Sequence, residues 1–377
     1  MLTKELARMI AFDTVSNRPV TALASHLAQR AEDQGFSVDL YEKPGDPNKV
    51  NVVASIGPED KDGLILSGHM DVVPTENQPW DTDPFQLTER DGKLYGRGSS
   101  DMKGFIACAL NACDALDLKK IQSQLVLIWT HDEEVGCQGS RLLADALKKS
   151  PRRLPSQCWI GEPTDFQVLR MHPGHVSVRI RATGEAAHSS KPYLGASAIK
   201  AMQRVLELCE SIEEDLKTER RLEEVLDNPW VAFNVGTIQG GEAVNVVPDS
   251  CEIVLGYRPL PGDEPRAVFE RLQRGMGQLA LPDNTHIEAQ IQTLSPAMYT
   301  PEGIALQHAL LDHAHTHELG AASFGTDGGN LADLGIQSLI FGPGSIDVAH
   351  KANEYVSRQA LEDGVTMIKK VIQKRCF

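Results

Sequence analysis

The chain has 377 residues, of which 41% are hydrophobic and 24% are charged. These proportions are ordinary for a soluble globular enzyme, and they exclude collagenous, disordered and disulfide-scaffold proteins. The formal net charge of −15 argues against nucleic acid or an anionic membrane surface as a partner, because both are polyanions. A chain of this length can fold into one large domain or two ordinary ones.

The cellular location is predicted from the first residues, the apolar runs and the cysteines. Residues 1–10 mix charged and apolar side chains at helical spacing, so we expect an amphipathic helix there rather than an export signal. No apolar run approaches the ~20 residues that a membrane span needs. The seven cysteines are scattered without a C-x-x-C pair, which indicates free, buried thiols in a reducing compartment. We therefore expect a cytoplasmic protein.

Short apolar runs alternate with helical patterns in the first half of the chain and again near its end. The predicted strands are residues 37–41, 49–56, 64–67, 125–130, 158–160 and 338–341. The predicted helices are residues 22–34, 102–116 and 140–149. This alternation predicts an α/β sheet with helices on its faces. Polar side chains follow several of the strands, at His69, at residues 132–134 and at Glu162, where ligands bind in such sheets.

The pattern changes between residues 176 and 292. We expect the order strand, helix, strand, strand, helix, strand, at residues 176–182, 196–217, 232–239, 250–257, 264–279 and 286–291. This is the βαββαβ order of a ferredoxin-like unit. The charged stretch 213–224 is interpreted as a solvated helical face. Sheet-forming sequence resumes after Ser295, so the predicted domains are a discontinuous one of residues 1–174 and 294–377 and an inserted one of residues 175–293.

Five segments carry side chains that could bind a metal, and each is ambiguous alone. Asp71 can reach back to His69 and fix its tautomer, with or without a metal on the ring. Asp101 precedes a helix, where a plain N-cap is the commoner role. The acids at residues 132–134 repel one another unless a cation neutralises them or they are exposed. Two further segments deliver Glu162 at a strand end and His350 from a glycine-rich turn.

Taken together, the five segments predict a metal centre. Two histidines and several carboxylates at strand ends or loops match the nitrogen and oxygen ligands of a catalytic zinc pair. Metals roughly 3.5–4 Å apart can share a carboxylate. One further carboxylate must stay off the metals to act as a base.

The motifs resemble those of the two-domain di-zinc aminoacylase, acetylornithine deacetylase and carboxypeptidase-G family, which includes succinyl-diaminopimelate desuccinylase. The resemblance runs over nearly the whole chain. Its motifs occur here in order as Ser-Gly-His-Met-Asp, Gly-Arg-Gly-Ser-Ser-Asp-Met-Lys-Gly, Asp-Glu-Glu-Val-Gly, Gly-Glu-Pro-Thr and Ala-His-Lys. It implies a catalytic domain with a mixed, mostly parallel sheet flanked by helices, and an inserted ferredoxin-like lid domain through which two copies form a homodimer.

The resemblance also implies the roles of individual residues. Two Zn²⁺ ions, which Co²⁺ or Mn²⁺ can replace, would be bound by His69, Asp101, Glu134, Glu162 and His350, with Asp101 bridging them. Glu133 would be the general base and Asp71 the partner of His69. The family further implies a cis peptide bond after Asp101.

The predicted lid domain contributes substrate contacts in the resembled enzymes. His188, in a Gly-x-x-x-His-Ser pattern, would polarise the scissile carbonyl, from the neighbouring subunit or from a closing lid. Asn245 and Arg258 match positions that bind substrate, and the guanidinium fork of Arg258 suits a carboxylate. A structural salt bridge is the alternative role for Arg258. Gly325 and Thr326 belong to a further turn expected to contact the substrate.

The implied substrate is a small N-acyl amino acid. Residues 341–346, 349–351 and 353–355 look closest to acetylornithine deacetylases, which would release ornithine and acetate for arginine biosynthesis. Residues 324–330 depart from that pattern, and the desuccinylases carry a comparable turn. A desuccinylase or a broader aminoacylase is therefore the alternative. An inactive, ligand-binding relative would lack the base or several ligands, and all of them are present.

Several other histidines receive no chemical role. His313, His315 and His317 follow Leu306, Leu310 and Leu311, so we expect surface histidines on an amphipathic helix. His172 and His175 lie at the passage into the inserted domain.

Overall fold

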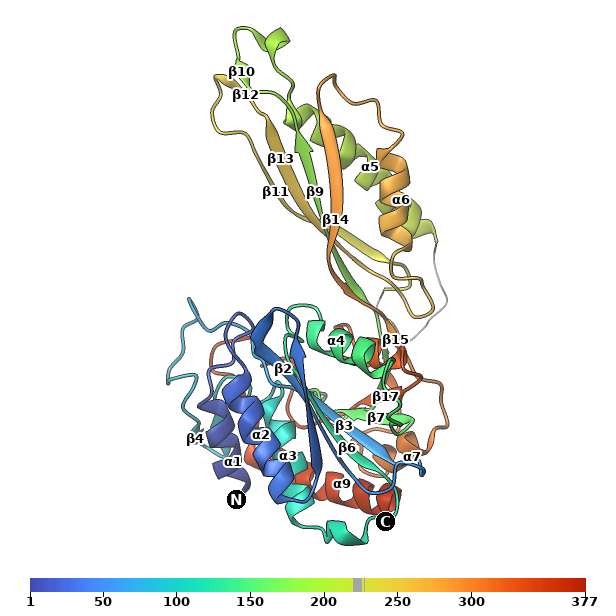
Figure 1. Ribbon diagram of the computed structural model, residues 1–377. Helices are drawn as coiled ribbons and strands as arrows, with labels where there is room; N and C mark the ends of the chain where they lie inside the picture. Colours follow the sequence, from blue (N-terminus) through green and yellow to red (C-terminus); the bar gives the residue numbers. More distant parts are fainter. Residues whose placement is uncertain (220–225, 227) are drawn as a thin grey trace. The chain divides into compact units, whose positions relative to one another are not determined.

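The computed structural model describes residues 1–219, 226 and 228–377, and these form two compact units (Figure 1). Unit 1 comprises Met1–Met171, Met298–Ala322 and Thr326–Phe377. Unit 2 comprises His172–Ala297 and Ser323–Gly325, so a later tripeptide joins the unit formed by the middle of the chain.

Unit 1 is built on a mixed sheet with the strand order β1-β2-β6-β3-β7-β17-β8-β15, and β16 pairs with β8. The strands β3, β6, β7 and β17 are parallel neighbours, whereas β2 runs antiparallel to β1 and β6. Their bounds are β1 Ser37–Lys43, β2 Asp46–Ile56, β3 Leu64–His69, β6 Leu125–Thr130, β7 Gln157–Ile160, β8 Leu169–His172, β15 Met298–Tyr299, β16 Gly320–Ala321 and β17 Gln337–Ile340.

Helices cover both faces of this sheet, as Figure 1 shows with α3 and α9 on one side and α4 on the other. The helices are α1 Leu2–Ile10, α2 Thr21–Asp33, α3 Lys103–Asp114, η1 Leu118–Lys120, α4 Gln138–Leu147, α7 Ala305–Leu311, α8 Gly328–Ala332 and α9 Arg358–Cys376. A small antiparallel sheet is formed by β4 Thr88–Arg90, β5 Lys93–Tyr95 and β18 Tyr355–Ser357.

Helix α3 is buried along nearly its whole length. Residues 103–113 are all buried, because α3 contacts both β3 and α9. Central strands such as β6 are likewise buried along their whole length, which explains their continuous apolar sequence. The segment that follows Asp101 is therefore anchored in the core.

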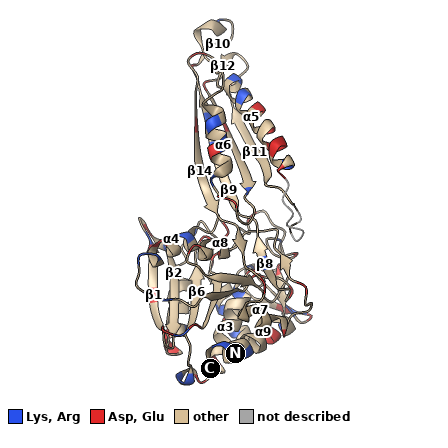
Figure 2. Cartoon of the chain, turned by 90° about the vertical axis from the view of Figure 1, so that its right-hand side faces the viewer, with Lys and Arg blue, Asp and Glu red and all other residues tan. Residues whose placement is uncertain are grey.

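Unit 2 has an antiparallel sheet with the order β11-β13-β9-β14, the strand order of a ferredoxin-like unit. Helices α5 and α6 pack against one face of it, on a core that includes alternate residues of β9. The colouring of Figure 2 places acidic and basic residues along both helices. The bounds are β9 His175–Thr183, β10 Ala187–His188, η2 Pro192–Leu194, α5 Ala198–Thr218, β11 Ala232–Gly240, β12 Val246–Val247, β13 Ser250–Arg258, α6 Ala267–Met276 and β14 His286–Ser295.

The predicted fold class is confirmed, with differences in detail. Helix α7 ends at Leu311, so the amphipathic helix expected to carry His313 and His317 is wrong in its extent. His315 and His317 are exposed beyond that helix, and His313 is half-buried. Part of the charged stretch 213–224 lies outside the described residues. No helix within the described residues is long and apolar enough to cross a membrane.

Candidate metal centre and active site

The predicted metal ligands in unit 1 follow the carboxyl ends of parallel strands. His69 ends β3, Glu134 follows β6, Glu162 follows β7 and His350 lies in the loop after β17. Asp101 stands two residues before the buried helix α3. Because neighbouring parallel strands end at the same edge of a sheet, residues distant in sequence meet there.

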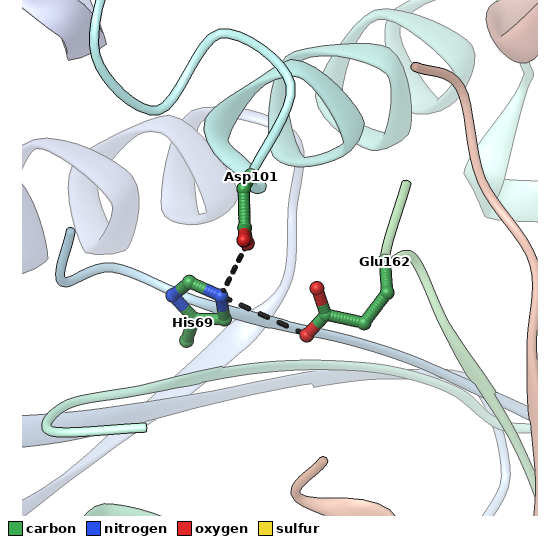
Figure 3. Close-up of side chains that lie close together, drawn as sticks. All are labelled: His69, Asp101 and Glu162. Atoms are coloured by element: carbon green, nitrogen blue, oxygen red, sulfur yellow. Dashed lines mark hydrogen bonds and ion pairs between the residues drawn. The ribbon is translucent and has the colours of Figure 1, made fainter. Parts of the chain in front are cut away.

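The first group of ligand atoms belongs to His69, Asp101 and Glu162 (Figure 3). His69 Nε2 lies 2.9 Å from Asp101 Oδ1 and 3.7 Å from Glu162 Oε1. All three residues are buried. On the other side of the ring, His69 Nδ1 lies 2.9 Å from the carbonyl oxygen of Asp71. A proton on Nδ1 donated to that carbonyl leaves the Nε2 lone pair facing the carboxylates, which is the arrangement of a metal-bound histidine.

The second group consists of Asp101, Glu134 and His350. His350 Nε2 lies 3.2 Å from Asp101 Oδ2 and 3.0 Å from Glu134 Oε2. Asp101 therefore presents one carboxylate oxygen to each group, as a bridging ligand would. The Asp101–Met102 peptide bond is cis, as expected.

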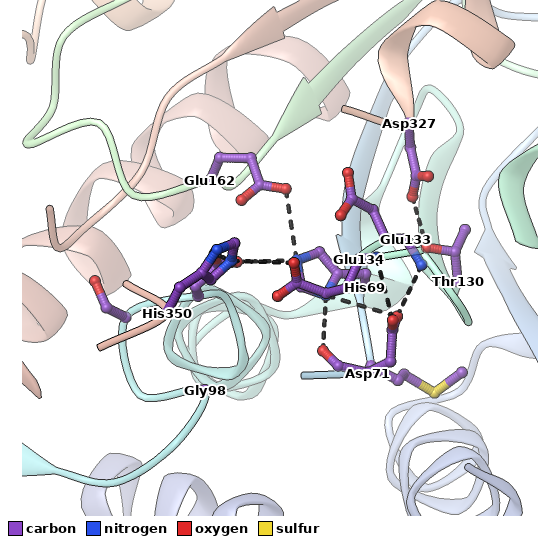
Figure 4. A network of polar contacts seen from close by, with 12 residues as sticks. His69, Asp71, Gly98, Thr130, Glu133, Glu134, Glu162, Asp327 and His350 are labelled. Atoms are coloured by element: carbon purple, nitrogen blue, oxygen red, sulfur yellow. Dashed lines mark hydrogen bonds and ion pairs between the residues drawn. The ribbon is translucent and has the colours of Figure 1, made fainter. Parts of the chain in front are cut away.

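The carboxylate of Asp71 contacts different partners from those the sequence suggests. Its Oδ1 is 3.8 Å from His69 Nδ1, and the backbone carbonyl takes the hydrogen-bonding position instead. The carboxylate accepts hydrogen bonds from the backbone N–H groups of Glu133 and Glu134, at 3.0 and 3.2 Å, and from Ser16 Oγ at 2.8 Å. Asp71 thus connects the His69 strand to the turn that carries two acids (Figure 4).

The electrostatics of the cluster favour a cation. Burial raises the pKa of Glu133 and of Glu162 well above the usual range, and neighbouring carboxylates act in the same direction on both. Burial also raises the pKa of Glu134 to about 7. Hydrogen bonds to Asp101 and Glu134 raise the pKa of His350 to about 10. Buried acids crowded in this way are stabilised by divalent cations, and the histidine and carboxylate donors fit a pair of them.

The buried carboxylate of Glu354, to which the sequence assigns no role, holds the Asp101 loop. Glu354 accepts hydrogen bonds from the backbone N–H groups of Gly98, Ser100 and Asp101, at 2.9 to 3.1 Å. It also forms an ion pair of 2.7 Å with Arg97, and both side chains are 1% exposed. An acid within a loop carries no signal in sequence that would distinguish this role from solvent exposure.

The same network extends to the loop of His350. Arg97 donates a hydrogen bond of 2.6 Å to Gln78 Oε1, and Gln78 Nε2 donates one of 3.0 Å to the carbonyl of His350. The side chains of Gln78, Arg97 and Glu354 therefore join the loop of Asp101 to the loop of His350.

The turn after β6 is held from the neighbouring strand β2. The buried Lys49 Nζ lies 2.6 Å from Asp132 Oδ1, and Asn51 accepts a hydrogen bond from the backbone of His131. Asn51 also donates to the carbonyl of Gly139, at the start of α4. These contacts fix both ends of the turn that carries Glu133 and Glu134.

The remaining predicted residues are distributed between the units. His188, Asn245, Arg258 and Gly325 belong to unit 2, and Thr326 belongs to unit 1. His188 is exposed, and its Nδ1 accepts a hydrogen bond from the backbone N–H of Ser190 at 3.2 Å. In the neutral ring the proton is then on Nε2, which is free to donate. The buried Thr326 Oγ1 accepts a hydrogen bond from Gly328 N, at the start of α8.

Comparison with known proteins agrees with this geometry. Residues 65–374 match the model of the peptidase family M20/M25/M40. The chain belongs to this family. It is 36% identical to an acetylornithine deacetylase from Myxococcus xanthus, over 94% of this chain and 92% of that protein. A second acetylornithine deacetylase, from Edwardsiella ictaluri, is 34% identical over 97% of this chain and 93% of that protein.

Solved structures of M20 proteins share the fold. An M20 family metallo-carboxypeptidase from Sulfolobus solfataricus superposes with a TM-score of 0.78 at 18% identity, covering 99% of this chain and 98% of that chain. A dinuclear metal-binding M20 peptidase from Bacillus subtilis superposes with a TM-score of 0.65 at 15% identity, covering 99% and 98% of the two chains. The chain is thus an M20 enzyme, a metal-dependent hydrolase that acts on an amide.

Proposed function

We propose that this M20 enzyme removes the acetyl group from N-acetylornithine, releasing ornithine and acetate. The observation that carries the proposal is the similarity, at 36% and 34% identity over nearly the full chain, to proteins named acetylornithine deacetylase. The cluster of histidines and carboxylates at the sheet edge supplies the matching chemistry. On this proposal the reaction is a step of arginine biosynthesis.

Five residues would bind the two metals, which we propose to be Zn²⁺, with Co²⁺ or Mn²⁺ as substitutes. His69 and Glu162 would bind one ion, Glu134 and His350 the other, and Asp101 both. Their ligand atoms lie close enough together to support this assignment. When bound, such a metal pair supplies Lewis acidity to the amide carbonyl and lowers the pKa of water.

Glu133 is proposed as the general base. Its backbone N–H is held by Asp71 at 3.0 Å, so the turn is anchored while the side chain stays outside the two groups of ligand atoms. Glu133 would take a proton from the attacking water and deliver it to the departing amine. His188, from a closing lid or from a partner copy, would donate its Nε2 proton to the oxyanion.

Substrate recognition is proposed for four other residues. Arg258 would bind the α-carboxylate through its guanidinium, and Asn245 would contribute an amide. Gly325 and Thr326, at the start of the segment that leads into α8, would complete the contacts with the amino acid.

One sequence feature favours a second substrate. Asp327 and the glycines after it, in residues 324–330, resemble a desuccinylase turn, so succinyl-diaminopimelate is the alternative substrate and a broader aminoacylase activity is a further one. A panel of N-acetylornithine, N-succinyl-diaminopimelate and N-acetylmethionine, assayed with metal-free and metal-loaded protein, distinguishes these activities. We expect metal-dependent release of acetate with N-acetylornithine as the best substrate. A protein that binds these compounds without hydrolysing any of them would contradict the proposal.

We further propose a homodimer formed through unit 2, in the cytoplasm. Strand β11 is an edge strand of the unit 2 sheet, and Ile238 on it is 59% exposed. An edge strand with an exposed apolar side chain can pair with another chain. The cytoplasmic location is supported by the cysteines, which are buried free thiols.

A further inference from the structure

A third group of metal-binding side chains lies beside the two already described. One donor atom from each of Glu133, Cys137 and Asp327 lies within 4.8 Å of the other two. Cys137 Sγ is 3.4 Å from Glu133 Oε1. In a tetrahedral zinc site, a thiolate sulfur and a carboxylate oxygen are separated by about 3.5 Å, given the usual bond lengths. The existing separation therefore matches two ligands of one ion.

The third donor is a buried carboxylate with an unused oxygen. Asp327 is 3% exposed, and Oδ2 accepts a hydrogen bond of 2.5 Å from Thr130 Oγ1. Among the described residues, Oδ1 makes no well-aligned hydrogen bond; the neighbouring hydroxyl of Ser140 donates to the carbonyl of Cys137 instead. A buried carboxylate oxygen without a partner is costly, and a cation is one way to satisfy it.

The three donors are held in place by the fold of unit 1. The backbone N–H of Cys137 donates to the carbonyl of Glu133 at 2.8 Å, which closes a turn and brings the two side chains together. Asn330, one turn after Asp327, donates to the carbonyl of Cys137 and to Ser140 Oγ, at 3.1 and 2.9 Å. Helix α8 is thereby fastened to the start of α4. A cation would find its ligands already arranged.

We propose that Glu133, Cys137 and Asp327 form a third cation site, selective for thiophilic ions such as Zn²⁺ and Cd²⁺, and that its occupation stops catalysis. The thiol loses its proton to solvent when the sulfur–metal bond forms. The sulfur ligand distinguishes this site from the other two groups, whose nitrogen and oxygen donors bind a wider range of metals. The inhibitory part of the proposal rests on the proposed role of Glu133, because a carboxylate bound to a cation cannot accept a proton from water.

Binding is tested by titrating Cd²⁺ into protein already loaded with two equivalents of metal, while the ultraviolet absorption of a cadmium–thiolate bond is followed. We expect one further equivalent to produce this absorption. It should be lost in Cys137→Ser and require at least tenfold more Cd²⁺ in Asp327→Asn, a variant that keeps the side-chain volume and one acceptor. Cys209→Ser, which removes a buried thiol from unit 2, is the matched control and should keep the absorption. Absence of the absorption in the wild-type protein, or its persistence in Cys137→Ser, would overturn the site.

Inhibition is tested in the same proteins with excess Zn²⁺ or excess Mg²⁺. Zinc should inhibit hydrolysis by the wild-type enzyme at concentrations at least tenfold below those that inhibit Cys137→Ser. Magnesium, a hard cation, should affect the activity of the two proteins equally. Equal sensitivity of both proteins to zinc would overturn the inhibitory role. If the absorption appears without any inhibition, the cation site stands and the role proposed for Glu133 is contradicted, so the two proposals fail in different ways.

Discussion

At the scale of single residues, the carboxylates of the site differ in the groups that they contact. Asp101 shares its oxygens between two histidines, while Glu133 lies outside both groups of ligand atoms. Neighbours in sequence, Glu133 and Glu134, are thus given different surroundings by one turn. This separation supports the proposal that Glu133 transfers protons while Glu134 binds metal.

The first prediction concerns Glu133→Gln. Gln retains the shape of the side chain but cannot accept the proton, so turnover should fall by about 10²–10⁴-fold. Metal content, measured by elemental analysis, should stay the same because Glu133 is outside the ligand groups. Glu59→Gln, at an exposed position in unit 1, is the control and should keep full activity. Normal turnover in Glu133→Gln would remove Glu133 from the mechanism.

A second prediction concerns the stability of the fold and His172, which is fully buried in unit 2. Burial lowers the pKa of His172 to about 4, and Arg258 acts in the same direction. In the unfolded chain a histidine titrates near pH 6.5. Since the pKa of His172 is lower in the folded protein than in the unfolded chain, protonation favours the unfolded chain. The stability of the fold is therefore unaffected by His172 above pH 6.5 and falls as the pH falls toward 4. The whole loss amounts to about 3 kcal/mol.

Urea unfolding at pH 7 and pH 4.5 measures this loss. Between pH 7 and pH 4.5, the free energy of unfolding should fall by about 2–3 kcal/mol more in the wild-type protein than in His172→Asn. His286→Asn, at an exposed position on β14, should behave like the wild type. Identical pH dependence in all three proteins would contradict the buried, neutral state of His172.

At the scale of elements, loops rather than strands decide the geometry of the metal centre. The strands deliver His69 and Glu162, but Asp101 and His350 come from loops that have no regular structure of their own. Side chains replace regular structure there. Glu354 accepts from the backbone of the Asp101 loop, Gln78 donates to the carbonyl of His350, and Arg97 joins these two side chains.

The third prediction therefore concerns Glu354→Gln. Removing the charge leaves Arg97 buried without its partner, so the free energy of unfolding should fall by roughly 3–5 kcal/mol. Glu89→Gln is a matched control, since Glu89 pairs with Arg358 at 46% and 39% side-chain exposure and its loss should change the free energy of unfolding far less. Calorimetric titration should also show weaker metal binding in Glu354→Gln alone. Equal effects of the two substitutions would show that the buried pair has no special role.

At the scale of the whole molecule, each unit has its own hydrophobic core and its own sheet. Among the residues that the structure describes, the metal-ligand groups form within unit 1. Unit 2 can therefore serve assembly without altering the ligand set. Its edge strand β11 and the edge strand β1 of unit 1 both expose an apolar side chain, Ile238 and Leu40.

The fourth prediction uses these two positions. If the homodimer forms through unit 2, Ile238→Glu should weaken it at least tenfold in sedimentation equilibrium, because charges would meet or be desolvated in the interface. Leu40→Glu introduces the same charge on an edge strand of similar exposure, 55% against 59%, and should leave the association unchanged. A wild-type protein that sediments as a monomer at micromolar concentrations would contradict the dimer.

The sequence by itself determined the fold class, the βαββαβ order and the approximate positions of the central strands, because apolar periodicity and buried strands are local properties. Strand β6, for example, begins and ends where its apolar run does. It also identified His69, Asp101, Glu134, Glu162 and His350 as candidates, since each belongs to a recognisable motif.

Only the tertiary structure decided how these candidates contact one another. It assigned one oxygen of Asp101 to each histidine, and it turned the Asp71 carboxylate toward the backbone of Glu133. The roles of Glu354 and Asp327 were equally inaccessible from sequence, because the cited partners lie 253 and 197 residues away along the chain. Burial, hydrogen bonding and proximity of this kind depend on three-dimensional packing, for which a single sequence carries no local signal.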